Sequence, residues 1–584
     1  MSAYTKQKPP FGRTELALAA LAACLFAAWA FVWDRVGLLH AGPIAYGNHE
    51  ACDAWYYFGL SVLPKAGLLT VPGTRTLSRV MYFGVVHELR SLVPWLGLAV
   101  LSYFLFLPLA LASLYIALRA TFSRATAALA VLILGTSPLM LNMMSTTYVT
   151  VAALAYGCGM LMCLMWAGRL SASDGAASNA LFAAGGLLFA WAANANIIAI
   201  EFLFFFCAFA LIGRIPATNG LPQLVKYLCK AGALFVVGAT AGVVITMLFA
   251  QLLGLGLLSP FNQVRAAVEG VGAGWQYEGW QAESVGPLLP PLAAILLASA
   301  LWQARRRSGA RKFDLVLVAG IATATCAYNF FATLVLGDQG LVYDYFYFLI
   351  LPCIGLAFCA AFDDAIAAAD PRKLVGLFAA VIGFVLVFNA AMALSDGVKG
   401  LLFSRPHTVS YASLFVLALI VALANKARFG TVLVAIVSVT VLLQTAAHRT
   451  LMTMYYHPRE PMQRHTEMAE AALGFIFRHL DGEPVLWLAK GDDFRLPLPI
   501  VRGLQRCRFA GAFPDALPDP NANAQPPLAP GRTVIVIDGA ARRVDQIEAA
   551  LQPYGYRLDI SATRHFALDW RQSVQITIGK VRAL

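Results

Sequence analysis

The sequence predicts a polytopic α-helical membrane protein with about 13 transmembrane helices, interfacial helices in its first outer loop and a small C-terminal α/β domain. Hydrophobic residues make up 59% of the 584 residues and charged residues only 13%, whereas a soluble domain carries about 25% charged residues. The apolar residues come in runs of about twenty, and a helix of that length crosses about 30 Å of hydrocarbon. From His448 onward the composition changes to that of a soluble protein.

The apolar runs set the expected spans, with boundaries good to a few residues. We expect them at residues 14–33, 95–118, 126–142, 149–167, 180–194, 196–213, 229–258, 285–303, 314–336, 341–361, 374–395, 408–425 and 429–447.

Lys and Arg mark alternate connections between these spans. The densest cluster lies at 305–312, whereas the connections around Asn142, Asn194 and Gly337 carry no basic residue. Cytoplasmic loops of membrane proteins are enriched in Lys and Arg, so the pattern predicts a cytoplasmic N-terminus and a periplasmic C-terminus. The net charge of +12 therefore reports topology, and we expect no nucleic-acid partner.

Three outer segments are more than connectors: residues 34–94, residues 259–286 and the tail from about His448 onward. Residues 34–94 form a long first loop whose aromatic-rich, half-polar stretches are typical of helices that lie along the membrane interface. Residues 259–286 form a second periplasmic loop. Cys52 and Cys507 both fall in outer segments, and a disulfide between them is one alternative that the sequence leaves open.

The chain divides into a transmembrane domain, 1–450, and a periplasmic α/β domain, 451–584. Within the second, the pattern predicts helices at 466–480 and 542–551 and strands at 485–489, 533–537, 561–570 and 574–578. No glycine pattern of a nucleotide site occurs there.

Two carboxylates stand just outside the first span, Glu50 and Asp53. Because they are three residues apart, they would share one face of a helix near the headgroup boundary. Such a pair suits metal binding, or proton abstraction from an acceptor hydroxyl or amine. The structural alternative is an acid that merely starts an interfacial helix, where a negative charge is favourable.

A further acid, Glu201, lies about five residues into the sixth expected span, or about 7 Å deep, and follows Asn194 and Asn196. An acid within a span is costly unless it is paired or faces a wet cavity, so Glu201 is a functional candidate. The alternative is a hydrogen-bonded glutamic acid that ties helices together.

The inside N-terminus, the long acid-bearing first loop and the outer C-terminal domain together resemble the membrane glycosyltransferases of the GT-C superfold. Relatives include protein O-mannosyltransferases, aminoarabinose transferases of lipid A and oligosaccharyltransferase catalytic subunits. The run 53–59, Asp-Ala-Trp-Tyr-Tyr-Phe-Gly, with Gly73-Thr74-Arg75 downstream, resembles first loops of bacterial members. The resemblance implies that an acid of the first loop is the base or metal ligand, which maps to Asp53 and, second, to Glu50.

The resemblance also implies a polyprenyl-phosphate sugar donor, whose phosphate calls for Arg or Lys at the outer face. Arg75 and Arg79, four residues apart, and Arg265 in the second outer loop are the candidates, with lipid headgroups as the alternative partners of each. Asp344 and Tyr345 mark the outer end of the tenth span and are candidates for a sugar cavity or an aromatic belt.

These observations predict a glycosyltransferase of the bacterial inner membrane. It would transfer a sugar from the lipid-linked donor to a lipid, glycan or protein acceptor of the envelope. The sequence does not identify the sugar, and it leaves open whether a metal is bound, for which a divalent cation is the candidate. The main alternative is a secondary transporter with Glu201 as coupling site, although no internal repeat is found. The other alternative is a non-catalytic envelope assembly protein.

Overall fold

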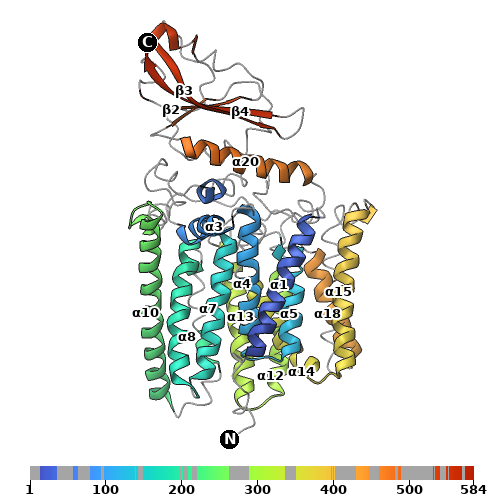
Figure 1. Cartoon of the computed structure of the whole chain (residues 1–584). Helices are drawn as coiled ribbons and strands as arrows, with labels where there is room; N and C mark the ends of the chain where they lie inside the picture. Colours follow the sequence, from blue (N-terminus) through green and yellow to red (C-terminus); the bar gives the residue numbers. More distant parts are fainter. Residues whose placement is uncertain are drawn as a thin grey trace.

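The computed structural model contains a bundle of long helices, a layer of short helices across one end of the bundle and a four-stranded sheet beyond that layer (Figure 1). The structure describes residues 13–35, 57–62, 79–93, 98–138, 140–141, 149–171, 173–196, 199–200, 208–212, 220–261, 289–335, 350–395, 397–398, 400, 413, 429–445, 459–479, 484–487, 531, 533–538, 548–549, 551–567 and 573–584.

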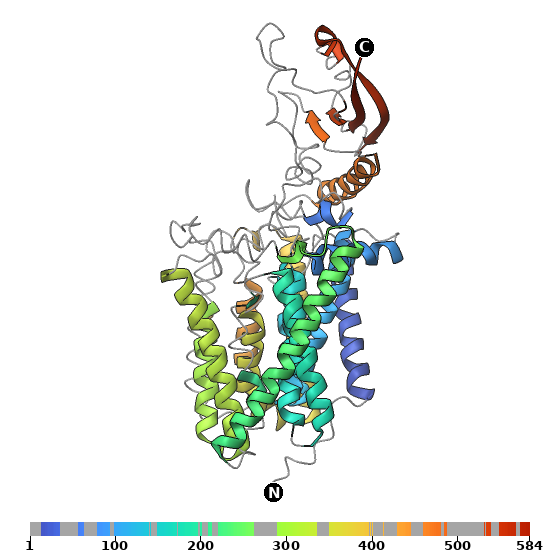
Figure 2. The ribbon, with the colours of Figure 1, turned by 90° about the vertical axis from the view of Figure 1, so that its left-hand side faces the viewer.

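The long helices run side by side between the two ends of the bundle (Figures 1 and 2). They are α1 (Arg13–Arg35), α4 (Leu98–Arg119), α5 (Arg124–Gly135), α7 (Thr150–Leu170), α8 (Gly175–Ala195), α10 (Leu221–Leu252), α12 (Leu289–Arg305), α13 (Ala310–Val335), α14 (Ile350–Ala367), α15 (Pro371–Leu394) and α18 (Phe429–Thr445). Among the described residues, 5 helices are long and apolar enough to cross a membrane: α7, α8, α10, α14 and α15. The prediction of a polytopic helical protein is thereby confirmed.

Each of these helices falls on an expected span, and most boundaries agree within a few residues. The expected span 408–425 and most of 196–213 lie outside the described residues, apart from short pieces such as η5 (Ala208–Leu211).

The bounds of α10 correct the expected span 229–258, because the helix begins and ends earlier. At its start, Gly220 has a φ of 123° and Pro222 stands in the first turn, a position that suits proline. At its end, Gly254 and Gly256 have φ values of 74° and 86°. Glycine adopts this left-handed backbone readily, so the chain leaves the helix although the apolar run continues.

The bounds of α14 also correct the prediction, since the helix continues past 361 to include Asp363 and Asp364. Asp363, whose side chain is 4% exposed, pairs with Arg311 of α13 and accepts the Ser123 N–H at 2.8 Å. Asp364 pairs with Arg307 at 2.7 Å. The apolar helix can therefore continue through two acidic residues, because Arg311 and Arg307 at the same end of the bundle neutralise their charges.

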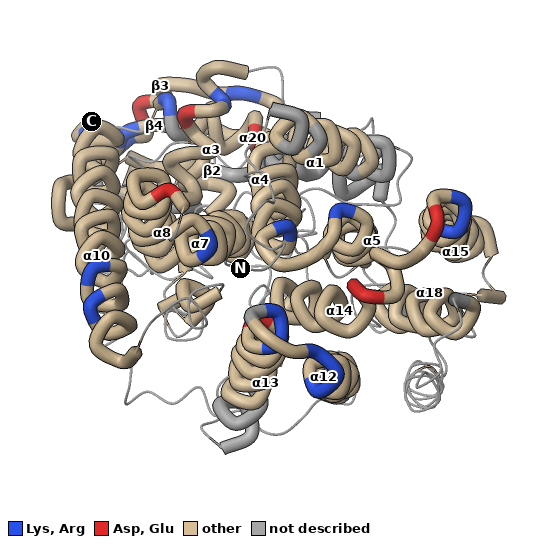
Figure 3. The backbone as a smooth tube through the Cα atoms, turned by 90° about the horizontal axis from the view of Figure 1, so that it is seen from below, with Lys and Arg blue, Asp and Glu red and all other residues tan. Residues whose placement is uncertain are grey.

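Basic residues gather at the end of the bundle that is opposite the sheet (Figure 3). They lie on the lower ends of α5, α7, α10, α12, α13 and α15 in the orientation of Figure 1, the end where α1 also begins. At the start of α15, the Lys373 backbone N–H and then its side chain hold the pKa of the exposed Asp370 carboxyl below its ordinary value. The alternation of charges along the sequence thus corresponds to one basic end in space.

Across the other end lie α3 (Val80–Leu92) and the helical residues 57–62. We expected helices at the interface here, and α3 does cross the ends of the long helices (Figure 1). Residues 57–62 and 80–84 are buried, however, so this layer is more enclosed than an interfacial helix exposed on one face. The absence of a side chain at Gly84 lets Phe249 of α10 and Leu253, which follows α10, approach α3, because a Cβ there would lie 2.6 Å from Leu253.

Helix α20 (Arg459–His479) separates this layer from the sheet. The sheet has the order β1-β2-β4-β3, formed by β1 (Pro484–Trp487), β2 (Thr533–Asp538), β3 (Tyr556–Ala567) and β4 (Ser573–Ala583). The β1–β2 pair is parallel and the other two pairs are antiparallel. Phe475 of α20 packs edge-on against Phe566 of β3, with ring centroids 5.9 Å apart. Each strand overlaps an expected strand, and α20 begins before the expected 466.

Candidate functional site at the sheet-facing end

The first turn of α3 is held by side chains from two long helices. The Met81 N–H donates to Asn194 Oδ1 of α8 at 2.9 Å, and Tyr156 Oη of α7 donates to the Met81 carbonyl at 3.0 Å. The N–H groups of a first helical turn have no partner within their own helix, and Asn194 supplies one from a distant part of the chain. The backbone N–H and C=O groups of Met81 are therefore both hydrogen-bonded to side chains of the bundle.

Arg79 directly precedes α3 and stands at its N-cap position, without a capping hydrogen bond from its side chain. Its guanidinium lies over the ring of Tyr57, with the Cζ atom 5.3 Å from the ring centroid. The Nε and Nη1 atoms of Arg79 are buried. A cation over an aromatic face is attracted by the ring quadrupole, and more strongly where water is excluded. Arg79 is thus a half-buried cation held over an aromatic ring, at the end of the bundle that faces the sheet.

A chain of aromatic rings continues from Tyr57 into the bundle. Tyr57 meets Tyr82, Tyr82 meets Phe106 and Phe106 meets Tyr156, each pair with centroids 6.0 Å apart. Tyr156 in turn meets Trp191 at 5.6 Å. Large rings in contact are stiff, so this chain fixes the first-loop layer relative to α4, α7 and α8.

Further polar contacts join α3 to residues 57–62, and join α3 to α20. His87 Nδ1 lies 3.0 Å from the Ser61 carbonyl, and Ser61 Oγ donates to the Tyr57 carbonyl at 2.9 Å. Arg90 of α3 and Glu470 of α20 form an ion pair at 3.1 Å. The site therefore lies between the bundle and α20, with contacts to both.

Two of the residues that the sequence singled out are described, Arg79 and Asn196. Asn196, 2% exposed, stands at the C-terminal end of α8, where its N–H donates to the Ala192 carbonyl at 2.8 Å. The remaining candidates lie outside the described residues: Glu50, Asp53, Arg75, Glu201, Arg265, Asp344 and Tyr345, together with Cys52 and Cys507.

Metal ligands were an open alternative at the acids of the first loop. Within the described parts of the chain, no group of three His, Cys, Asp or Glu side chains could hold a metal ion. Glu50 and Asp53 are not part of that set, so the metal question at these two acids stays a prediction.

Asn194 and Tyr156 are the residues that sequence reasoning missed. In the sequence, Asn194 marks a break between two expected spans and precedes Glu201, but it was not recognised as a contact residue, although an amide in an apolar helix needs a partner. Tyr156 lies inside an apolar run, and nothing in the run distinguishes it from other buried aromatic residues.

Comparison with solved structures finds chains of similar overall course. ArnT from Cupriavidus metallidurans bound to undecaprenyl phosphate is 17% identical at a TM-score of 0.47, over 95% of this chain and 97% of that chain. The oligosaccharyltransferase AglB from Archaeoglobus fulgidus, in complex with an inhibitory peptide and a dolichol-phosphate, is 12% identical at a TM-score of 0.44. That match covers 84% of this chain and 63% of that chain.

The apo form of the Archaeoglobus fulgidus oligosaccharyltransferase is also 12% identical, at a TM-score of 0.45 over 94% of this chain and 72% of that chain. No family model matches the sequence, and no curated protein matches it significantly. The chain is thus similar in course to ArnT and AglB, which are glycosyltransferases of the GT-C fold.

Proposed function

We propose that this protein is a membrane glycosyltransferase that moves a sugar from a polyprenyl-phosphate donor to an acceptor of the cell envelope. The observation that carries the proposal is the placement of Arg79, a first-loop arginine held over Tyr57 at the sheet-facing end of the bundle. A guanidinium binds phosphate through paired, charge-assisted hydrogen bonds, so this position suits the charged group of a lipid-linked donor.

Two other candidates, Asp53 and Arg75, are close in sequence to the Arg79–Tyr57 pair, and this supports including them in the proposed site. Asp53 precedes Tyr57 by four residues, and Arg75 precedes Arg79 by four. Four residues span at most about 14 Å, which limits how far each Cα can lie from the Arg79–Tyr57 pair. We therefore assign Asp53 and Arg75 to the same proposed site as Arg79.

The proposed reaction gives each residue one role. Asp53, supported by Glu50, accepts the proton of the acceptor hydroxyl or amine, whose oxygen or nitrogen forms a bond to the anomeric carbon of the sugar. The bond from that carbon to the phosphate oxygen breaks, and polyprenyl phosphate leaves. Arg75, Arg79 and Arg265 stabilise the negative charge that grows on the phosphate.

The proposed location is the bacterial inner membrane, with the basic end in the cytoplasm and α3, α20 and the sheet in the periplasm. This orientation rests on the enrichment of Lys and Arg in cytoplasmic connections. It places the donor phosphate at the outer headgroup boundary, where a membrane-bound polyprenyl chain would present it.

The test is transfer or slow hydrolysis of a polyprenyl-phosphate sugar by the purified full-length protein in nanodiscs. We expect Asp53→Asn to lose about 10²–10⁴ in rate, which is the usual contribution of a general base. Arg75→Ala or Arg79→Ala should weaken donor use roughly ten- to a hundredfold, since a charge-assisted contact contributes about 1.5–3 kcal/mol.

Glu88→Gln is the matched control, because Glu88 is an exposed acid of the same loop and should be dispensable. Glu201→Gln should have a small effect. A well-inserted Asp53→Asn protein with full activity would refute the assignment. Uptake into vesicles that requires Glu201, without turnover of the donor, would support a transporter instead. The absence of both activities would support an assembly protein.

A further inference from the structure

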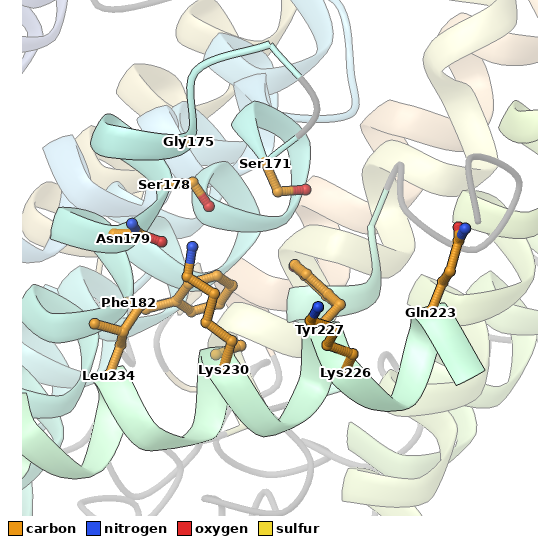
Figure 4. A pocket seen from close by; sticks show the side chains of 11 residues that line it. Ser171, Gly175, Ser178, Asn179, Phe182, Gln223, Lys226, Tyr227, Lys230 and Leu234 are labelled. Carbon is orange, nitrogen blue, oxygen red and sulfur yellow. The ribbon is translucent and has the colours of Figure 1, made fainter. Parts of the chain in front are cut away.

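A cavity lies at the basic end of the bundle, which is the end opposite Arg79. It lies between the first turns of α8 and the first half of α10 and has a volume of about 270 Å³. Its polar lining residues are Ser171, Ser178, Asn179, Gln223, Lys226, Tyr227 and Lys230 (Figure 4). Figure 4 shows the Lys230 side chain extending from α10 toward Asn179. The cavity is therefore a polar recess with two cations in its wall.

The two lysines stand four residues apart on α10, so their side chains share one face of the helix. Among the residues that the structure describes, neither ammonium group is part of an ion pair, and Asp174 is the acid nearest to the cavity in sequence. Asp174 caps α8 by accepting the Ala177 N–H at 2.9 Å, and it is not part of the lining. The positive charge of the recess thus has no acidic partner in its own wall.

An apolar groove continues from this recess along the same two helices. Phe182 and Ala231 line both cavities, and the groove has a volume of about 500 Å³. It follows α10 from Leu228 to Val243, a length of about 22 Å at 1.5 Å per residue. Its one hydroxyl belongs to Thr240, which donates to the Val236 carbonyl of its own helix. The groove is therefore dry and long enough for an extended acyl chain.

The groove opens toward the surroundings of the bundle. α10 stands at the edge of the molecule (Figure 3), and Val236, which lines the groove, is 62% exposed. An exposed valine in the middle of a helix that can cross a membrane meets lipid rather than water. The occupant of the groove can therefore enter sideways from the bilayer.

We propose that α8 and α10 bind one anionic phospholipid of the cytoplasmic leaflet. Its phosphate lies between Lys226 and Lys230, its polar headgroup lies against Asn179, and one acyl chain follows the groove to Val243. Basic recesses between helices on the cytoplasmic side attract anionic headgroups, and an adjoining apolar groove distinguishes a lipid from a free anion. The site is independent of sugar transfer, because it lies at the other end of the bundle from Arg79.

The test is native mass spectrometry of the full-length protein in detergent, titrated with phosphatidylglycerol or with phosphatidylcholine of the same acyl chains. Wild-type protein should bind phosphatidylglycerol more tightly. The double variant Lys226→Gln/Lys230→Gln should bind it roughly thirtyfold more weakly, since two lysines near an anionic surface each contribute about a factor of five. The matched control Arg305→Gln/Lys312→Gln removes two charges at the same end of the bundle and should bind as wild type does.

A third variant separates the lipid from a free phosphate. Ala239→Phe fills the groove without touching the lysines, and it should weaken phosphatidylglycerol binding while excess inorganic phosphate leaves wild-type lipid binding unchanged. Equal binding by wild type and the lysine double variant would overturn the proposal, as would equal losses in the control pair or no preference over phosphatidylcholine. Displacement of the lipid by inorganic phosphate, with Ala239→Phe unaffected, would mean an anion site without a lipid.

Discussion

Arg79 owes its position to hydrogen bonds that cross long stretches of sequence. Asn194 of α8 accepts the backbone N–H of Met81, and Tyr156 of α7 donates to its carbonyl, two residues after Arg79. Within a bundle that excludes water, a polar side chain on an apolar helix is stable only with a partner. The first turn of α3 supplies that partner, so the long helices and the first loop fix one another.

Tyr156→Phe removes one oxygen atom, which links α7 to the first turn of α3, and so tests this link. It should lower the free energy of unfolding by about 1 kcal/mol, the usual net contribution of such a hydrogen bond. Tyr227→Phe is the matched control, because Tyr227 Oη also donates to a backbone carbonyl, that of Ala210, at 2.8 Å. Both variants should lose similar stability, but only Tyr156→Phe should raise KM for the lipid-linked donor with little change in kcat. Equal KM values would show that Tyr156 has no positioning role.

At the scale of single residues, the sequence could identify Arg79 but not its surroundings. Arg79 was a candidate because a phosphate donor demands a basic residue in the first loop. Its stacking on Tyr57 and the hydrogen bonds to Met81 depend on contacts between residues 22 to 113 positions apart. Side-chain spacing within one element carries no information about such contacts.

At the scale of elements, α8 and α10 pack unusually close together. Among the described glycines, those at this crossing leave the least room for an added Cβ atom. A Cβ atom added at Gly238 would lie 1.8 Å from the Ala183 carbonyl oxygen, and one at Gly186 would lie 1.9 Å from that of Phe235. The backbones therefore touch directly. Small residues spaced four apart, here Gly238 and Gly242, are typical of such close crossings in membranes.

Gly238→Ala should separate the two helices and destabilise the protein by about 1–3 kcal/mol, the usual cost of overpacking. Gly232→Ala on the same helix is the control, because a Cβ there meets nothing within 4 Å. That control should be neutral or should stabilise by up to about 1 kcal/mol through the higher helix propensity of alanine. Thermal unfolding of the two variants in the same detergent measures the difference. Equal midpoints would contradict the close contact.

Element boundaries were predictable where the apolar run and the local backbone agree. α15 and α18 begin and end close to their expected spans because polar residues or turns flank the apolar runs. α10 departs because glycines at positive φ end it inside an apolar run. The β1–β2 pairing could not be predicted, since parallel strands far apart in sequence meet through tertiary packing alone.

At the scale of the whole molecule, one hydrophobic core runs from the bundle through the first-loop layer to the sheet. It includes Leu161 of α7, Val62, Leu473 of α20 and Ile576 of β4. A Cβ at Gly474 of α20 would lie 3.8 Å from Val62, so α20 packs directly on residues 57–62. The C-terminal part is therefore attached to the candidate site by apolar contact as well as by the Arg90–Glu470 ion pair.

The orientation of this assembly can be tested with reporter fusions. A reporter fused after Leu584 or inserted within 259–286 should be active only outside the cytoplasm, and one at 305–312 only inside. The reason is the enrichment of Lys and Arg at one end, since basic loops stay in the cytoplasm. A C-terminal reporter that is active in the cytoplasm would reverse the sidedness and move Arg79 away from the outer headgroups.

The most direct test of the proposed sugar transfer is the mass of envelope lipids and glycans in cells with and without this protein. Removal should shift one envelope component to a lower mass by a single sugar. Wild-type protein should restore the original mass, and Asp53→Asn protein present in equal amount in the membrane should not. Full restoration by Asp53→Asn, or an unchanged mass profile of all envelope lipids, glycans and glycoproteins upon removal, would contradict the account.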